Sequence, residues 1–143
     1  GDTGRIYADY GSLYVEDTQS PISGLVVHKC IVISGTLNIG DVVRAEVDYE
    51  KRQDTARNHS ATHMLHAALR EVLGLHVRQQ GSLVSQHRLR FDFTHVSPLT
   101  DDELLRVQSV TNQKIRENIE ILSIDTTYHH AVDRGALACL CIR

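Results

Sequence analysis

The segment RNHSATHMLHAALR, residues 57–70, carries three of the chain's nine histidines, His59, His63 and His66. On a helix that turns about 100° per residue, these imidazoles and Arg70 fall within a stripe about 60° wide. The opposite side of that helix carries Ala61, Met64, Leu65, Ala68, Leu69 and Val72. The segment therefore predicts a helix with one apolar face and one imidazole face.

We expect this helix to run from Thr55 to Leu73. Asp54 or Thr55 has a side chain that can cap the first turn. Gly74 is the residue type that most often ends a helix.

His59 and His63 are four residues apart, so both rings can reach one ion. Zinc bound through nitrogen at about 2.0–2.1 Å tolerates this spacing, but a zinc site usually takes three or four protein ligands. The same spacing also occurs on solvated polar faces, so the pair alone leaves both interpretations open. Ser60 stands where zinc metalloproteases have a glutamate, which argues against a peptidase.

Up to about residue 50 the sequence alternates short β-type runs with turn signals. The runs are SLYVED (12–17), SGLVVHKCIVIS (23–34) and VVRAEVD (42–48). We expect residues 1–50 to form a small antiparallel subdomain that resembles a β-barrel.

Residues 51–143 predict an α+β core in which helices pack on an antiparallel sheet. RLRFDF (88–93) alternates strictly, with Leu89, Phe91 and Phe93 on the side expected to be buried. The whole chain is therefore expected to belong to the α+β class.

A second helix is expected from Thr100 to about Asn118. Thr100 and Glu103 fit a capping box, in which each side chain accepts a hydrogen bond from the other's backbone. The residues expected near one face are Leu104, Val107, Thr111 and Ile115.

Three further elements follow in the sequence pattern. IEILSID (119–125) predicts a strand, YHHAVDRG (128–135) a short helix closed by Gly135, and ALACLCI (136–142) a buried strand. Cys139 and Cys141 are expected to be small core residues of this last strand rather than metal ligands.

Composition limits the classes of partner. The net charge of −3 and a pI near 6.3 argue against binding nucleic acid over the whole surface, so any RNA contact should be local. Three cysteines without framework spacing favour a reducing compartment, and the cytoplasm is the expected one. No apolar run approaches the roughly 20 residues that span a bilayer, so we expect no membrane contact.

The segment RNHSATHMLHAALREVLGLHVRQQGSLVSQHRLRFDF (57–93) closely resembles the editing domain of bacterial alanyl-tRNA synthetase. The resemblance continues through GDTGRIYADYGSLYVEDTQ (1–19) and TNQKIREN (111–118). Freestanding alanyl-tRNA editing proteins share this domain, and threonyl-tRNA synthetase carries a more distant relative.

The resemblance implies hydrolysis of tRNA(Ala) wrongly charged with serine or glycine. The partners would be the acceptor end of that tRNA and the mischarged ester, while ATP and magnesium belong to the synthetic domain of the parent enzyme. A freestanding editing protein, or a module that binds the acceptor end without catalysis, are the alternatives.

The resemblance also implies a zinc site. His59 and His63 match the first two family ligands, and a later cysteine and histidine complete the set. Those two are expected beyond Arg143, so the core would be truncated before its C-terminal ligand segment, with zinc weak or absent in this piece and little hydrolysis by it.

Two more positions match family pocket residues. Thr62 resembles a threonine that recognises the serine hydroxyl, although a helical threonine also commonly bonds its own backbone. Gln79 resembles a pocket glutamine, with an exposed loop amide as the alternative. His66 is outside the ligand pair and is expected to be an outer neighbour of the metal or a surface group.

Four arginines surround these positions, and they either contact phosphates or form a solvated face. They are Arg70, Arg78, Arg88 and Arg90.

Overall fold

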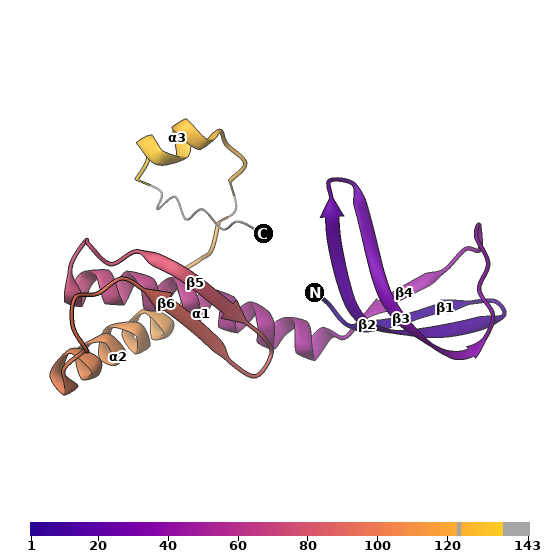
Figure 1. The fold of residues 1–143 in the computed structure, drawn as a ribbon, viewed down its shortest axis with the longest axis horizontal. Helices are drawn as coiled ribbons and strands as arrows, with labels where there is room; N and C mark the ends of the chain where they lie inside the picture. Colours follow the sequence, from indigo (N-terminus) through magenta and orange to yellow (C-terminus); the bar gives the residue numbers. More distant parts are fainter. Residues whose placement is uncertain (123, 136–143) are drawn as a thin grey trace. The chain divides into compact units, whose positions relative to one another are not determined.

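The computed structural model describes residues 1–122 and 124–135 and has an α+β fold with antiparallel sheets (Figure 1). The expected α+β class is confirmed. The chain divides into two compact units. Unit 1 holds residues 1–57 and 85–87, and unit 2 holds 58–84 and the chain from residue 88 onward, so that the division falls within the first helix.

Unit 1 contains a four-stranded antiparallel sheet in the order β3-β2-β1-β4. Its strands are β1 (Gly4–Ala8), β2 (Gly11–Ile22), β3 (Leu25–Gly35) and β4 (Arg44–Val47). Among the described residues this sheet is open, whereas a barrel requires a closed sheet. Closure needs the two edge strands to pair, and β4 offers four residues against the eleven of β3.

The three β-type runs expected from the sequence lie in β2, β3 and β4. Strand β1 was not expected, because its five residues, GRIYA, have little alternation. It forms because it pairs with strands on both sides: Ile6 lies opposite Leu13 of β2 and Ala45 of β4.

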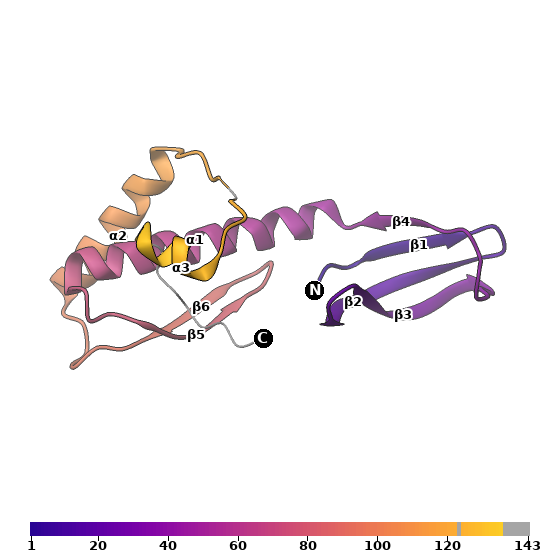
Figure 2. The same ribbon diagram turned by 90° about the horizontal axis from the view of Figure 1, so that it is seen from above.

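Helix α1 runs from Tyr49 to Leu73, so it begins six residues earlier than Thr55, where we expected it to start (Figure 2). Asp48 explains the early start. Its carboxylate accepts a hydrogen bond from the Lys51 amide at 3.5 Å, and its carbonyl accepts from the Arg52 amide at 3.0 Å. The first contact satisfies a free amide of the first turn, and the second is the first backbone hydrogen bond of the helix. The helix thus begins directly after Asp48, and neither Asp54 nor Thr55 is the cap.

Two glycines end helices as the sequence predicts. Gly74 follows α1 with a φ of 114°, and Gly135 follows the short helix α3 (Tyr128–Asp133) with a φ of 84°. Residues with a Cβ rarely adopt this left-handed backbone, which is why glycine is favoured at these positions.

Unit 2 combines a hairpin with helices. Strands β5 (Gln79–Val84) and β6 (Leu89–Phe93) pair antiparallel, and α2 spans Asp101–Arg116. The capping box of Thr100 and Glu103 is confirmed, since each side chain accepts a hydrogen bond from the other residue's backbone.

The core of unit 2 is a cluster of Ala68 and Leu69 from α1, Val107 from α2, and Val77, which is fully buried. Partly buried around it lie Leu65, Val72, Leu73, Phe91, Phe93, Leu99 and Val110. The inward side expected for Phe91 and Phe93 is thus confirmed.

The side of α2 that faces this core differs from the expected one. Val107 is buried, but Leu104 and Ile115, which we placed on the same face, are each about half exposed. Val110 packs on the cluster instead, so the helix is rotated from the face that we predicted.

The expected strand at 119–125 is wrong for the described residues of that segment, which carry no strand. Alternation makes a strand possible, but pairing with a neighbour is what stabilises it. Ile121 and Leu122 are instead largely exposed. Helix α3 is confirmed, whereas the expected strand at 136–142, with Cys139 and Cys141, lies outside the described residues.

Within the described ranges, no helix is both long enough and apolar enough to cross a bilayer.

We expect Leu69→Ala to lower the free energy of unfolding by about 2–5 kcal/mol, because truncating a buried leucine leaves a cavity. Leu69 is 3% exposed. Urea denaturation followed by circular dichroism measures the loss. Leu105→Ala in α2 is the control, since Leu105 is 63% exposed and should change stability by less than about 0.5 kcal/mol. Equal losses in the two variants would contradict this description of the core.

Candidate functional site

His59 and His63 converge on the exposed side of α1. Their Nε2 atoms lie 3.3 Å apart, and their ring centroids lie 5.0 Å apart. Two nitrogen ligands at 2.0–2.1 Å from one tetrahedral zinc ion would be about 3.3–3.4 Å apart. The separation therefore fits two ligands of a single ion, although two imidazoles that share a hydrogen bond can adopt it as well.

Two convergent imidazoles alone are fewer ligands than a zinc site needs. Among the described residues, no group of three or more histidine, cysteine, aspartate or glutamate side chains is arranged to hold a metal ion. A structural or catalytic zinc site takes at least three protein ligands. Any tight site would need donors from outside residues 1–122 and 124–135.

Thr62 lies between the two histidines in sequence but faces inward, with 4% of its surface exposed. Its hydroxyl donates a hydrogen bond to the Asn58 carbonyl, one turn back, at 2.8 Å. The proton of the hydroxyl is thus engaged, while the oxygen keeps the capacity to accept a hydrogen bond.

Gln79 comes from a different element. It is the first residue of β5, paired with Phe93 of β6, so the loop that we expected here is a strand. Its amide nitrogen donates to the Ser82 hydroxyl at 3.2 Å. The contacts of the structure join His59 to His63 directly, whereas Thr62 and Gln79 each bond to other neighbours.

His66 lies in the core rather than at the surface. It is 6% exposed, and its ring packs against Phe91 with the centroids 5.1 Å apart. Burial lowers the pKa of His66, a hydrogen bond with the Val77 backbone opposes this shift, and the charge of Arg70 adds to it. The imidazole is therefore held in its neutral form more strongly than in the unfolded chain.

The imidazole stripe of α1 is thus divided by the way the helix packs. His66 and Thr62 lie on the buried side, and His59 and His63 lie on the exposed side. A helical projection does not separate these residues, because it does not show which side of the helix packs against the core.

Arg70 and Arg90 are both engaged within the chain. Arg70 donates to the carbonyls of Leu75 and Val77, at 3.1 and 3.0 Å. Arg90 forms an ion pair with Asp92 at 3.1 Å. Sequence reasoning missed the role of Arg70, although a basic residue in the last turn of a helix is a known sign of carbonyl binding.

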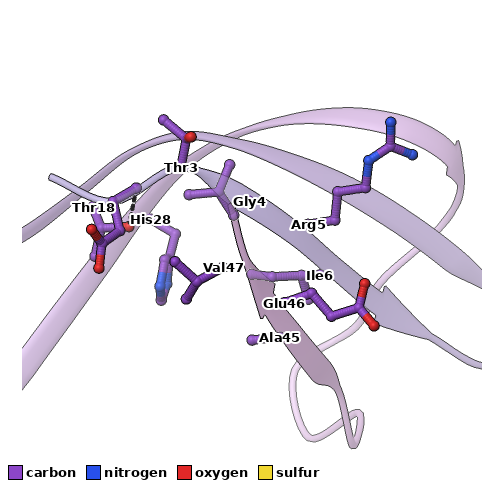
Figure 3. A pocket seen from close by; sticks show the side chains of 11 residues that line it. Thr3, Gly4, Arg5, Ile6, Thr18, His28, Ala45, Glu46 and Val47 are labelled. Atoms are coloured by element: carbon purple, nitrogen blue, oxygen red, sulfur yellow. Dashed lines mark hydrogen bonds between the residues drawn. The ribbon is translucent and has the colours of Figure 1, made fainter. Parts of the chain in front are cut away.

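Unit 1 carries a small open pocket on its sheet, shown in Figure 3. It is lined by Asp2, Thr3, Gly4, Arg5, Ile6, Val15, Thr18, His28, Ala45, Glu46 and Val47. The Thr18 hydroxyl donates to the Asp2 carbonyl at 2.8 Å at its edge. Its volume of about 40 Å³ is enough for a few water molecules.

The chain resembles one kind of protein along nearly its whole length. It is 50% identical over 137 residues to the alanine–tRNA ligase of Pseudothermotoga lettingae, 48% over 138 residues to that of Nitrosomonas europaea, and 45% over 138 residues to that of Dehalococcoides mccartyi. Each match covers 96% of this chain. The chain is homologous to a segment of alanine–tRNA ligase.

The matched segment is a minor part of those alanine–tRNA ligases. The chain spans 16% of the length of each of the three relatives. No family model matches the chain.

We expect the stability of the chain to fall as the pH drops below about 6.5, the ordinary pKa of histidine, in part because of His66. Since its pKa is lowered on folding, the unfolded chain binds more protons in this range, and protons favour unfolding. In His66→Phe, which keeps an aromatic ring beside Phe91, the free energy of unfolding should fall less between pH 7.5 and pH 5.5. Urea titrations at both values test this, and an identical decrease in the two proteins would contradict it.

Proposed function

We propose that this chain is the part of an alanine–tRNA ligase that hydrolyses serine and glycine esters of tRNA(Ala). The observation that carries the proposal is the His59–His63 pair, whose Nε2 atoms lie 3.3 Å apart on α1. The supporting observation is the sequence match of 45–50% to alanine–tRNA ligases across 96% of the chain. The acceptor end of tRNA(Ala) is the proposed partner.

The length of the relatives favours a ligase over a freestanding editing protein. The chain corresponds to 16% of each relative, so the same segment stands within a much longer polypeptide there. ATP and magnesium would serve another part of that polypeptide, and the cytoplasm, where tRNA is charged, would be its compartment.

The reaction is the hydrolysis of an ester. Water attacks the carbonyl carbon that joins the amino acid to the terminal ribose, the tetrahedral intermediate collapses, and the ribose oxygen leaves with a proton. His59 and His63 would hold zinc through their Nε2 atoms, together with donors outside the described residues. When bound, zinc would polarise the ester carbonyl or its attacking water, or hold the substrate's amino group.

Thr62 would distinguish serine by its hydroxyl. Because the Thr62 proton is engaged with Asn58, its oxygen would accept the hydrogen bond from the serine side chain. A site built to hydrogen-bond a hydroxyl discriminates strongly against a substrate that lacks it. An apolar pocket discriminates only weakly against a substrate that carries one. This would favour the serine ester over correctly charged alanine, whereas hydrolysis of the glycine ester, which has no side-chain hydroxyl, would not depend on Thr62.

Gln79 would orient the ester. Its amide nitrogen is held by Ser82 within the first residues of β5, which restricts its rotation. A primary amide carries both donor hydrogens and an acceptor oxygen, and this group would hold the ester in place. Placement at the start of a paired strand makes the group more rigid than a loop residue would be.

The test is the release of serine from Ser-tRNA(Ala) by the full-length protein that contains this segment. We expect His63→Ala to reduce kcat/KM by about 100-fold or more, because a metal site loses one ligand. A chelator should reduce the rate similarly, and added zinc should restore it only in the parent.

His87→Ala is the matched control, since His87 is an exposed histidine of the β5–β6 turn. It should hydrolyse Ser-tRNA(Ala) as the parent does, and both variants should still charge tRNA with alanine. If the parent leaves the ester intact at every metal concentration, or if His63→Ala remains fully active, the proposal is wrong.

Thr62→Val tests the proposed specificity. Valine keeps the shape of threonine and removes the hydroxyl, so the hydrolysis of Ser-tRNA(Ala) should fall about tenfold, which corresponds to one hydrogen bond. Gly-tRNA(Ala) has no side-chain hydroxyl, and its hydrolysis should change less than about twofold. Parallel measurements of kcat/KM on the two esters check this. Equal losses on both would assign Thr62 a purely structural role.

A further inference from the structure

We infer that Arg70 and Thr94 are positioning residues that set the place of Gln79 beside the His59–His63 helix, an inference that rests on the proposed function. Neither side chain needs to touch the substrate. They act on the connection between α1 and β5, residues 74–78, which leads directly into Gln79.

Arg70 holds one side of this connection. From the last turn of α1, its guanidinium donates to the carbonyls of Leu75 and Val77, at 3.1 and 3.0 Å. Charge-assisted hydrogen bonds of this kind are stronger than neutral ones. The residues that follow α1 are therefore hydrogen-bonded back to its last turn.

Thr94 holds the other side of the connection. Its hydroxyl accepts from the Arg78 amide at 3.0 Å and donates to the His76 carbonyl at 2.9 Å. Its own amide donates to the Arg78 carbonyl at 3.0 Å. Thr94 follows β6 directly, so these bonds extend the pairing of the hairpin back to residue 76.

The two sets of bonds alternate along the backbone. Carbonyls 75 and 77 point to Arg70, and carbonyls 76 and 78 point to Thr94. Residues 75 and 76 form a turn, in which the Val77 amide donates to the Gly74 carbonyl at 3.2 Å, and the two sets of bonds hold this turn and the two residues after it. The Val77 side chain, fully buried in the core, adds a third point of attachment.

The position of Arg70 on α1 links this connection to the histidine pair. His63 and Arg70 are seven residues apart, nearly two turns, so they share a face about 10 Å apart along one rigid helix. β5 and β6 lie beside that helix in both views (Figures 1 and 2). A displacement of about 1 Å in a substrate-orienting group can cost about 100-fold in rate, so the place of Gln79 matters.

A double-mutant cycle in the full-length protein tests the inference, with kcat/KM for Ser-tRNA(Ala) as the readout. Arg70→Met keeps a long side chain of high helix propensity and removes the donors. It should reduce kcat/KM about tenfold when Gln79 is present. In the Gln79→Ala background the loss should be less than about twofold, because the contribution of the Gln79 side chain is already absent there. Zinc content should be the same in all variants.

Thr94 supplies a second, independent cycle. Thr94→Val removes the hydroxyl at constant shape, and we expect a loss of about fivefold that again disappears in Gln79→Ala. Thr94→Ser keeps the hydroxyl and should restore most of the rate. Arg70→Lys, which can still donate to one carbonyl, should lie between Arg70→Met and the parent.

The outcomes separate the two proposals. If the parent does not hydrolyse Ser-tRNA(Ala), the proposed function fails, and the inference fails with it. If the parent is active but Arg70→Met and Thr94→Val cause the same fold loss with and without Gln79, only the inference is overturned, because both residues then act on stability alone. If the losses in kcat/KM caused by Arg70→Met and Thr94→Val both disappear in the Gln79→Ala background, the inference is supported.

Discussion

Burial of Val77 against Ala68 and Leu69 is the contact on which the rest of unit 2 depends. A helix of 25 residues has to turn one face away from water, and this contact decides which face α1 uses. His66 and Thr62 then lie inside, and His59 and His63 remain on the exposed side. The exposure of the His59–His63 pair therefore follows from the packing of the helix.

The same packing brings α1 and the β5–β6 hairpin together. Phe91 and Phe93 pack on the cluster from the hairpin, and the His66 ring lies against Phe91. A two-stranded hairpin is only marginally stable by itself, so its helix-facing side has to be covered. The His59–His63 pair and Gln79 therefore lie on elements that stabilise each other.

Local chemistry explains which elements could be predicted. The Thr100–Glu103 capping box, the glycines that follow α1 and α3, and the strict alternation of 88–93 act over a few residues, and the structure has them where they were predicted. The N-terminus of α1 was misplaced because Asp48, Asp54 and Thr55 are all acceptable caps. The expected strand at 119–125 failed because a strand also requires a partner.

The sequence by itself determined the α+β class, the helix that carries the histidines, and the convergence of His59 with His63, since a four-residue spacing fixes two side chains on one helix. Tertiary structure alone decided that His66 is buried, that the unit 1 sheet stays open, and that Arg70 and Thr94 hold the connection to Gln79. The burial of His66 against Phe91 and the bonds of Thr94 join residues far apart in the chain, so they exist only once the core has formed.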